Sequence, residues 1–179
     1  MKISFEPRRI GELEILDLAL PGTVISTHKP KRRGRAVDRA IEAVARTGAL
    51  VRTRVADDAD AAAALKLDLE ILTLRAAEIE SGRQIDHAPG ELNHRTPIVI
   101  FVVDLDWDDD DGSSQEVLDV VAKLWDITRS ATATLVVSTP TSPVSIPLRF
   151  RTGGVIHLAG KGYQQYAQLY TALQLRAAS

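Results

Sequence analysis

The run Ile98–Val103, which reads Ile-Val-Ile-Phe-Val-Val, limits the fold of this chain more than any other stretch. All of its side chains are apolar, and the run is too short for a helix of its own. A strand that is covered on both faces gives such an unbroken apolar run, whereas a strand with one solvated face alternates. We therefore predict a central strand of a parallel sheet at 98–103, with helices on both of its faces.

Strands and helices alternate along the rest of the chain. Residues 23–27 and 50–55 are rich in β-branched side chains and predict strands, and further strands are expected at 134–137 and 155–158. Segments with helical periodicity lie between them. This alternation is typical of a parallel sheet with helices on both faces. The expected fold class is therefore α/β, with three layers and a mostly parallel sheet.

Helical periodicity predicts helices at about 35–47, 58–79 and 164–177. The first of them would complete a βαβ unit with the two strands that flank it. A further helix is expected after an acidic loop, where Ser113 and Glu116 have the spacing of a capping box. The apolar stripe of this helix consists of Val117, Val120, Val121, Leu124 and Ile127.

A chain of 179 residues supports one hydrophobic core, so we expect a single domain over 1–179. Residues 23–179 would form its core, and residues 1–22 an N-terminal extension or edge strands, at 3–5 and 14–18. The longest apolar runs are far shorter than a membrane-spanning helix, which predicts a cytoplasmic protein without membrane insertion. The chain has no cysteine, which excludes disulfides, a thiolate nucleophile and a Cys-ligated zinc site.

The formal net charge of -2 hides an uneven distribution. Residues 127–179 contain no Asp or Glu, so any carboxylate chemistry must lie upstream. The densest basic stretch lies between the first strand and the first helix. Such a run often contacts phosphates, although a solvated loop is an equally good interpretation. The candidate contacts for DNA phosphates or an acidic partner are Lys29, Lys31, Arg32, Arg33 and Arg35.

Asp104 directly follows the apolar strand, and Asp106 comes two residues later. Ligands of open α/β sheets bind at the carboxyl edge, and in a nucleotide hydrolase an Asp at this point holds magnesium. The same Asp-x-Asp spelling begins the haloacid-dehalogenase phosphotransferases, in which the first Asp is the nucleophile and the second a general acid. That interpretation fails because those enzymes need later carboxylates for magnesium, and no acid follows Asp126.

Two other local patterns carry less information. Gly154–Gly162 superficially resembles a phosphate-binding loop, but its spacing favours a strand and a turn, with Lys161 as a candidate anion-binding residue. His87, Glu91 and His94 have helical spacing for metal ligation, but a Pro-Gly pair interrupts the helix. We therefore expect these three to be solvated connector residues, and no metal site.

Five short segments are similar, in their order along the chain, to segments of one family. Residues 24–32 resemble a strand with an Asp-Pro-Lys turn, and residues 55–65 resemble a Val-x-Asp segment that opens a long helix. Residues 97–104 resemble a Walker B strand. Residues 134–140 resemble the strand before an Ala-Thr-Gln sensor loop, and residues 146–150 an Ile-Pro-x-Arg-Ile/Phe segment. Together they resemble the second half of the motor domain of FtsK/SpoIIIE-type DNA translocases. The resemblance covers roughly 23–158 and implies a RecA-like, P-loop NTPase-like fold and DNA translocation.

The chain departs from this family at the residues that carry catalysis. It contains no Gly-x-x-x-x-Gly-Lys-Ser/Thr, so a Walker A motif is missing. Leu105 stands where the catalytic Glu would follow the Walker B Asp, and Pro140 or Thr141 stands at the sensor Gln. Each electrostatic contact of this kind contributes about 3 kcal/mol to transition-state stabilisation. A self-sufficient ATPase is therefore not expected.

The sequence favours a degenerate FtsK-like domain that needs no cofactor and binds DNA, an active motor subunit, or a secretion or conjugation partner. Self-association is also expected, and Arg149 and Arg151 are candidates for a subunit interface. Two alternatives stay open. One is a Mg-ATP-dependent ATPase or phosphohydrolase that uses Asp104 and Asp106, completed by a P-loop from another chain. The other is a purely structural interaction module.

Overall fold

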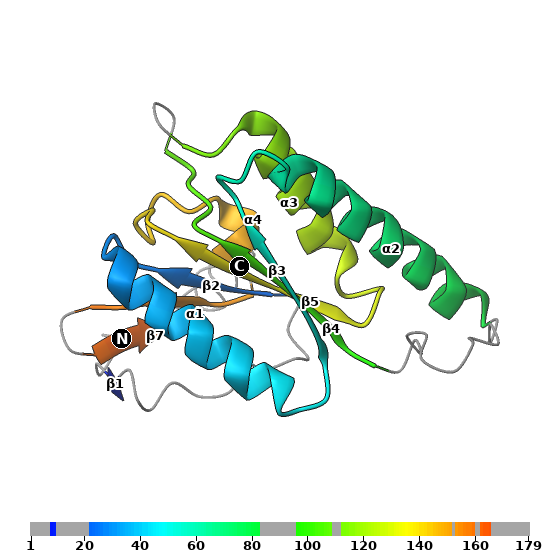
Figure 1. The fold of residues 1–179 in the computed structure, drawn as a ribbon, viewed down its shortest axis with the longest axis horizontal. Helices are drawn as coiled ribbons and strands as arrows, with labels where there is room; N and C mark the ends of the chain where they lie inside the picture. The colour runs from blue at the N-terminus through cyan, green and yellow to red at the C-terminus, as the bar shows by residue number, and fades with distance from the viewer. Residues whose placement is uncertain are drawn as a thin grey trace, which may run out of the picture.

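The computed structural model describes residues 22–82, 96–108, 112–151 and 153–159, together with the backbone of 8–9 and 162–165. Strands and helices alternate through most of this part of the chain (Figure 1). The elements are β1 (Arg8–Arg9), β2 (Gly22–Ser26), α1 (Pro30–Ala45), β3 (Leu50–Val55), α2 (Ala61–Ser81), β4 (Ile98–Val103), α3 (Gln115–Ile127), β5 (Ala133–Thr139), α4 (Leu148–Arg151), β6 (Val155–His157) and β7 (Gly162–Gln165).

The strands form one sheet in the order β1-β7-β6-β2-β5-β4-β3. The five strands from β6 to β3 are parallel, and β7 and β1 extend the sheet with antiparallel pairing. The helix α1 covers one face, and α2 and α3 cover the other (Figure 1). The predicted class, a three-layer α/β fold with a mostly parallel sheet, is confirmed. The arrangement is consistent with a RecA-like fold.

Two apolar cores lie on the two faces of the sheet, and alternate residues of β4 contribute to each. Ile98, Ile100 and Val102 pack on the side of α2 and α3, whereas Val99 and Phe101 pack under α1. Because both faces are covered, neither needs a polar residue, which explains the unbroken apolar run. The predicted strand at 98–103 is confirmed in its full length, and the adjacent β5 is buried throughout.

The backbone preferences of proline and glycine determine several helix ends. The helix α1 begins at Pro30, five residues before the predicted start, because proline is well suited to the first turn and the early basic residues are compatible with a helix. The helix α2 ends at Ser81, two residues after its predicted end, and Gly82 caps it with a left-handed φ of 62°. None of the helices in the described ranges combines the length and apolarity needed to cross a membrane.

Two local predictions are wrong. The N-cap of α3 is Ser114, whose hydroxyl accepts a hydrogen bond from the Val117 amide; Ser113 instead accepts one from the Asp106 amide, so the predicted capping box is absent. Gln164 and Gln165 belong to β7 and pair with β6, so no helix begins at Gln164. The remainder of that predicted helix, and the strands expected at 3–5 and 14–18, lie outside the described residues.

The first predicted βαβ unit is present, but its two strands are not neighbours in the sheet. The strands β2 and β3 lie in the same sheet and are joined through α1, but β5 and β4 separate them. Local sequence patterns identify each strand, but they do not determine which strands pair. Here β4 and β5, which come later in the chain, insert between β2 and β3. The consequence is that β2, the first parallel strand of the chain, lies inside the parallel sheet, between β6 and β5.

The burial of α2 predicts a sharp contrast between two leucines on the same helix. Leu72 is 1% exposed and Leu74 is 66% exposed. We expect Leu72→Ala to lower the free energy of unfolding by about 2–5 kcal/mol, because it leaves a cavity in the core. Leu74→Ala should change it by less than about 0.5 kcal/mol. The measurement is urea denaturation of both variants. Equal losses of unfolding free energy in the two variants would contradict the packing of α2.

Candidate functional site at the carboxyl edge of the sheet

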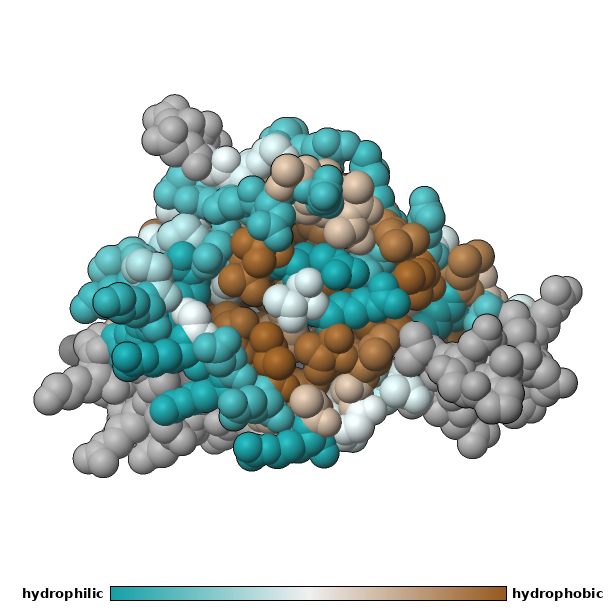
Figure 2. Space-filling view, viewed as in Figure 1, coloured by the Kyte–Doolittle hydropathy of each residue, from teal (hydrophilic) through white to brown (hydrophobic). Residues whose placement is uncertain are grey.

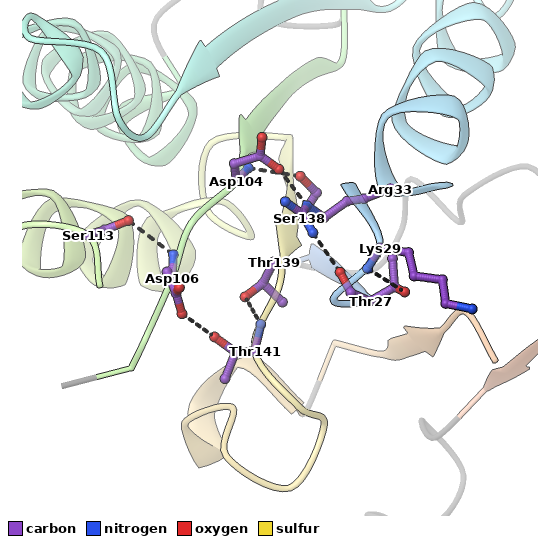
Figure 3. A network of polar contacts seen from close by, with 9 residues as sticks. All are labelled: Thr27, Lys29, Arg33, Asp104, Asp106, Ser113, Ser138, Thr139 and Thr141. Carbon is purple, nitrogen blue, oxygen red and sulfur yellow. Dashed lines mark hydrogen bonds and ion pairs between the residues drawn. The ribbon is translucent and has the colours of Figure 1, made fainter. Parts of the chain in front are cut away.

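The carboxyl ends of β2 and β5 lie side by side, and the chain leaves them toward opposite faces of the sheet. From β2 it runs into α1 on one face, whereas from β5 it continues to α4, whose Phe150 packs into the core on the other face. Open α/β sheets bind ligands where neighbouring connections diverge in this way. The polar side chains that gather there form the candidate site (Figure 3).

An ion pair between Arg33 and Asp104 is the centre of the site. Arg33 Nε lies 2.5 Å from Asp104 Oδ1, and Arg33 Nη1 donates a 2.6 Å hydrogen bond to the Thr27 carbonyl oxygen. The Arg33 side chain is 7% exposed and that of Asp104 is 40% exposed. Arg33 was predicted together with the phosphate contacts, but its guanidinium is engaged inside the protein by Asp104 and Thr27. The ion pair thus neutralises the carboxylate that follows β4.

The backbone at Asp104 adopts a left-handed conformation, with φ at 61°. Asp is one of the few residues other than Gly that tolerate this region, at a cost of about 1–2 kcal/mol. The neighbouring strand fixes the turn, because the Asp104 amide donates to Ser138 Oγ at 3.0 Å and the Leu105 amide donates to the Ser138 carbonyl at 2.9 Å. The carboxylate is therefore held in position from β5 as well as from α1.

Asp106 is held by different partners from Asp104. Its Oδ1 accepts hydrogen bonds from Thr141 Oγ1 at 2.8 Å and from the Asp108 amide at 3.1 Å. Its own amide donates to Ser113 Oγ at 3.0 Å. Each of the two carboxylates predicted as magnesium ligands therefore has protein partners of its own (Figure 3). Among the described residues, no group of three or more acidic or histidine side chains is arranged to hold a metal ion.

Buried hydroxyl groups line the ends of β2 and β5. A Ser-Thr pair lies at the carboxyl end of each strand, Ser26-Thr27 at β2 and Ser138-Thr139 at β5, and all four residues are buried. Ser26 Oγ donates to the Thr141 carbonyl at 2.7 Å, and Thr139 Oγ1 accepts from the Thr141 amide at 3.0 Å. The sequence analysis did not assign these hydroxyls to the site. The repeated dipeptide was the available signal, but it gains meaning only when the two strands are known to be neighbours.

His157, at the end of β6, adds a titratable group to this edge. Burial lowers the pKa of His157, and the charges of His28 and Arg32 lower it further, whereas a contact with Ser26 raises it. The Nδ1 atom lies 3.4 Å from Ser26 Oγ. The imidazole is therefore neutral at pH 7. The sequence analysis did not single out this residue, because its surroundings are supplied by two other segments.

Positive charge is concentrated where β2 leads into α1. His28, Lys29, Lys31 and Arg35 are exposed, and the half-buried Arg32 donates to the carbonyl oxygens of 158 and 159 at 3.4 and 3.5 Å. The first turn of α1 contains no acidic residue, so the positive end of the helix dipole adds to these charges. We call the four exposed side chains the basic cluster. It lies directly beside the buried Arg33–Asp104 pair.

The remaining predicted site residues are elsewhere. Arg149 Nη1 lies 3.7 Å from Asp126 Oδ2, and Arg151 donates to the carbonyl oxygens of Ile146 and Val144. Both arginines therefore have partners within the same chain. Lys161 and the His87, Glu91 and His94 group lie outside the described residues.

These features define an α/β domain whose parallel sheet carries a neutralised carboxylate and a basic cluster at one edge. Searches against protein-family models, curated proteins and solved structures returned no match to this chain. The resemblance to FtsK/SpoIIIE-type motors therefore stays a hypothesis based on the five sequence segments.

The buried position of Arg33 predicts a cost for breaking its ion pair. Arg33→Met removes the guanidinium and leaves Asp104 without its partner. Because Asp104 is 40% exposed, water compensates part of the loss, and we expect the free energy of unfolding to fall by about 2 kcal/mol. The matched control is Arg46→Met, since Arg46 is 80% exposed and 3.9 Å from Glu42. The control should lose less than about 0.5 kcal/mol in urea denaturation. Equal losses would contradict the role of the Arg33 pair.

The lowered pKa of His157 predicts a loss of stability in acid. Below pH about 6.5 the unfolded chain binds a proton at this residue that the folded protein resists, so stability falls as the pH falls toward the folded pKa. We expect His157→Gln to lose less stability than the wild type between pH 7 and pH 5. His28→Gln, at an exposed position, is the control. Identical pH profiles for the wild type and His157→Gln would show that His157 does not contribute.

Proposed function

We propose that this chain is a non-catalytic, FtsK/SpoIIIE-like domain that binds DNA through the basic cluster. The observation that carries the proposal is the concentration of exposed cations at the positive end of α1, with the carboxylate that follows β4, Asp104, already paired to Arg33. An anionic ligand at this edge would meet uncompensated positive charge. Nothing in the proposal requires nucleotide hydrolysis or a bound cofactor.

The connection between β2 and α1 supports binding over phosphoryl transfer. A phosphate-binding loop offers a series of backbone N–H groups at the start of its helix. Here only residues 27–29 separate β2 from α1, and the helix begins with Pro30, which has no N–H group. The Lys29 amide donates to Thr27 Oγ1 at 3.3 Å. The segment therefore presents its side-chain charges to a ligand more readily than its backbone.

The spacing of the cluster suits a polyanion. Lys31 and Arg35 are four residues apart on α1 and lie on the same side of the helix, and Lys29 directly precedes it. Each cation that neutralises a DNA phosphate releases a condensed counterion, which favours binding at low salt. An acidic surface on a motor, secretion or conjugation partner, or on a second copy of this chain, is the alternative ligand for the same cluster.

Fluorescence anisotropy with labelled duplex DNA at 50 and 200 mM salt tests the proposal. The variant Lys29→Ala/Lys31→Ala/Arg35→Ala should bind more weakly than the wild type. If all three side chains contact phosphates, the plot of log affinity against log salt concentration should become shallower, with the magnitude of its slope smaller by about 3. The matched control changes three exposed basic residues away from the cluster, Arg46, Lys123 and Arg129, to alanine. Equal weakening in both triple variants would mean that binding follows total charge, and the proposed site would be wrong.

The Mg-ATP alternative is favoured by the position of Asp104 at the end of β4, with 40% of its side chain exposed. A titration with fluorescent ATP and magnesium distinguishes the two functions. Magnesium-dependent nucleotide binding that disappears in Asp104→Asn would replace the proposed function with this alternative. DNA binding without nucleotide binding would support the proposal.

A further inference from the structure

The strand β3 forms one end of the sheet, and within the described residues only β4 pairs with it. The Leu50 amide donates to the Pro97 carbonyl and the Ala56 amide donates to the Val103 carbonyl, so the even-numbered backbone groups of β3 point toward β4. The amides of the odd-numbered residues, Val51, Thr53 and Val55, consequently point away from the sheet. A long edge strand of this kind is a template for a further strand.

Apolar side chains lie on both sides of this open edge. Leu67 and Leu74 of α2 are 54% and 66% exposed, and the half-buried Ile71 lies between them at helical spacing. This stripe adjoins the side of α2 that carries Asp68, which contacts β3 directly. On the other side of the strand, Val55 is 37% exposed. In Figure 2, apolar surface borders a hydrophilic strip in the middle of the view, where β3 runs in Figure 1.

The hydrophilic side chains of β3 leave an unbalanced charge beside the edge. Asp68 is fully buried, with Arg52 Nη1 at 2.6 Å from Oδ1 and Arg54 Nε at 2.7 Å from Oδ2. Both arginine side chains are about one-quarter exposed, at 23% and 25%. Two cations share one anion, so the group carries one net positive charge. Covering the edge would remove this charge from water, which is unfavourable unless the covering group brings a carboxylate.

We propose that β3 is a strand-addition site for an extended segment of a partner protein that carries an acidic residue toward Arg52 and Arg54. The backbone of the segment would pair with the outward amides of β3. Its acidic side chain would neutralise the excess charge on the α2 side, and its apolar side chains would cover Leu67 and Leu74. Charge complementarity thus specifies the partner, and open backbone groups and apolar surface provide the contacts.

A second copy of this chain does not meet these requirements. Antiparallel pairing of two β3 strands centred on Thr53 would place Arg52 opposite the Arg54 of the second copy, on the same face of the joined sheet. Like charges would then meet without an additional carboxylate. A nucleic acid would supply negative charge but no strand. The site is separate from the basic cluster and does not depend on DNA binding.

The test uses the full chain and the synthetic heptapeptide Thr-Val-Thr-Glu-Thr-Val-Thr, in which the glutamate and both valines lie on one face of the extended peptide. NMR titration should show slower amide exchange at Val51, Thr53 and Val55 when the peptide binds. A peptide with lysine in place of glutamate should bind about tenfold more weakly. A peptide with methylated backbone amides on its pairing side retains the side chains but cannot donate to β3, and it should lose binding.

Protein variants separate this surface from general apolar attraction. Leu74→Glu places a like charge beside the incoming glutamate and should weaken peptide binding. Leu148→Glu on α4, where the wild-type leucine is 57% exposed, is the matched control and should not. The proposal would be overturned if the lysine peptide, or the methylated peptide, bound as tightly as the unmethylated glutamate peptide. Self-association that protects the β3 amides without any peptide would overturn it in favour of a second copy.

Discussion

The burial of a parallel sheet on both faces organises the whole structure. Once α1 covers one face and α2 and α3 cover the other, the central strands have no solvated side on which to place polar groups. In a parallel sheet, all carboxyl ends meet at one edge. The architecture therefore brings together the hydroxyls at the ends of β2 and β5, the carboxylate after β4 and the cations around the start of α1, although β2, β4 and β5 are far apart in the sequence.

At the carboxyl edge of the sheet, some basic side chains are buried and others are exposed to solvent, and this difference determines the local charge. Arg33 turns inward from the first turn of α1 and neutralises Asp104, while its neighbours in the same basic run remain in solvent. A cation from the protein thus lies at the carboxylate where a nucleotide hydrolase uses magnesium. The same basic run supplies both an internal partner for Asp104 and an outward-facing cluster.

The two surfaces proposed for binding have opposite preferences. The basic cluster lies at the carboxyl edge and would attract a polyanion mainly through long-range, salt-dependent forces. The β3 edge offers backbone groups, apolar surface and a single excess charge, so it favours a short-range and directional contact. The two proposals together imply a domain that would bind a nucleic acid and a protein partner at the same time.

The sequence by itself determined the fold class, the five parallel strands and the three long helices α1, α2 and α3. The apolar run at 98–103 predicted β4, and the β-branched residues at 50–55 predicted β3, both at their full lengths. The sequence also predicted Asp104 at a ligand-binding edge, because period and burial are local properties of the chain. Only the tertiary structure decided that β2 lies between β5 and β6, that Arg33 differs from the other basic residues, and that Ser113 caps no helix. Those outcomes depend on contacts between segments that are distant in the chain. A side chain forms its hydrogen bond or ion pair with the partner that the folded structure places beside it, and that partner is not visible in the local sequence.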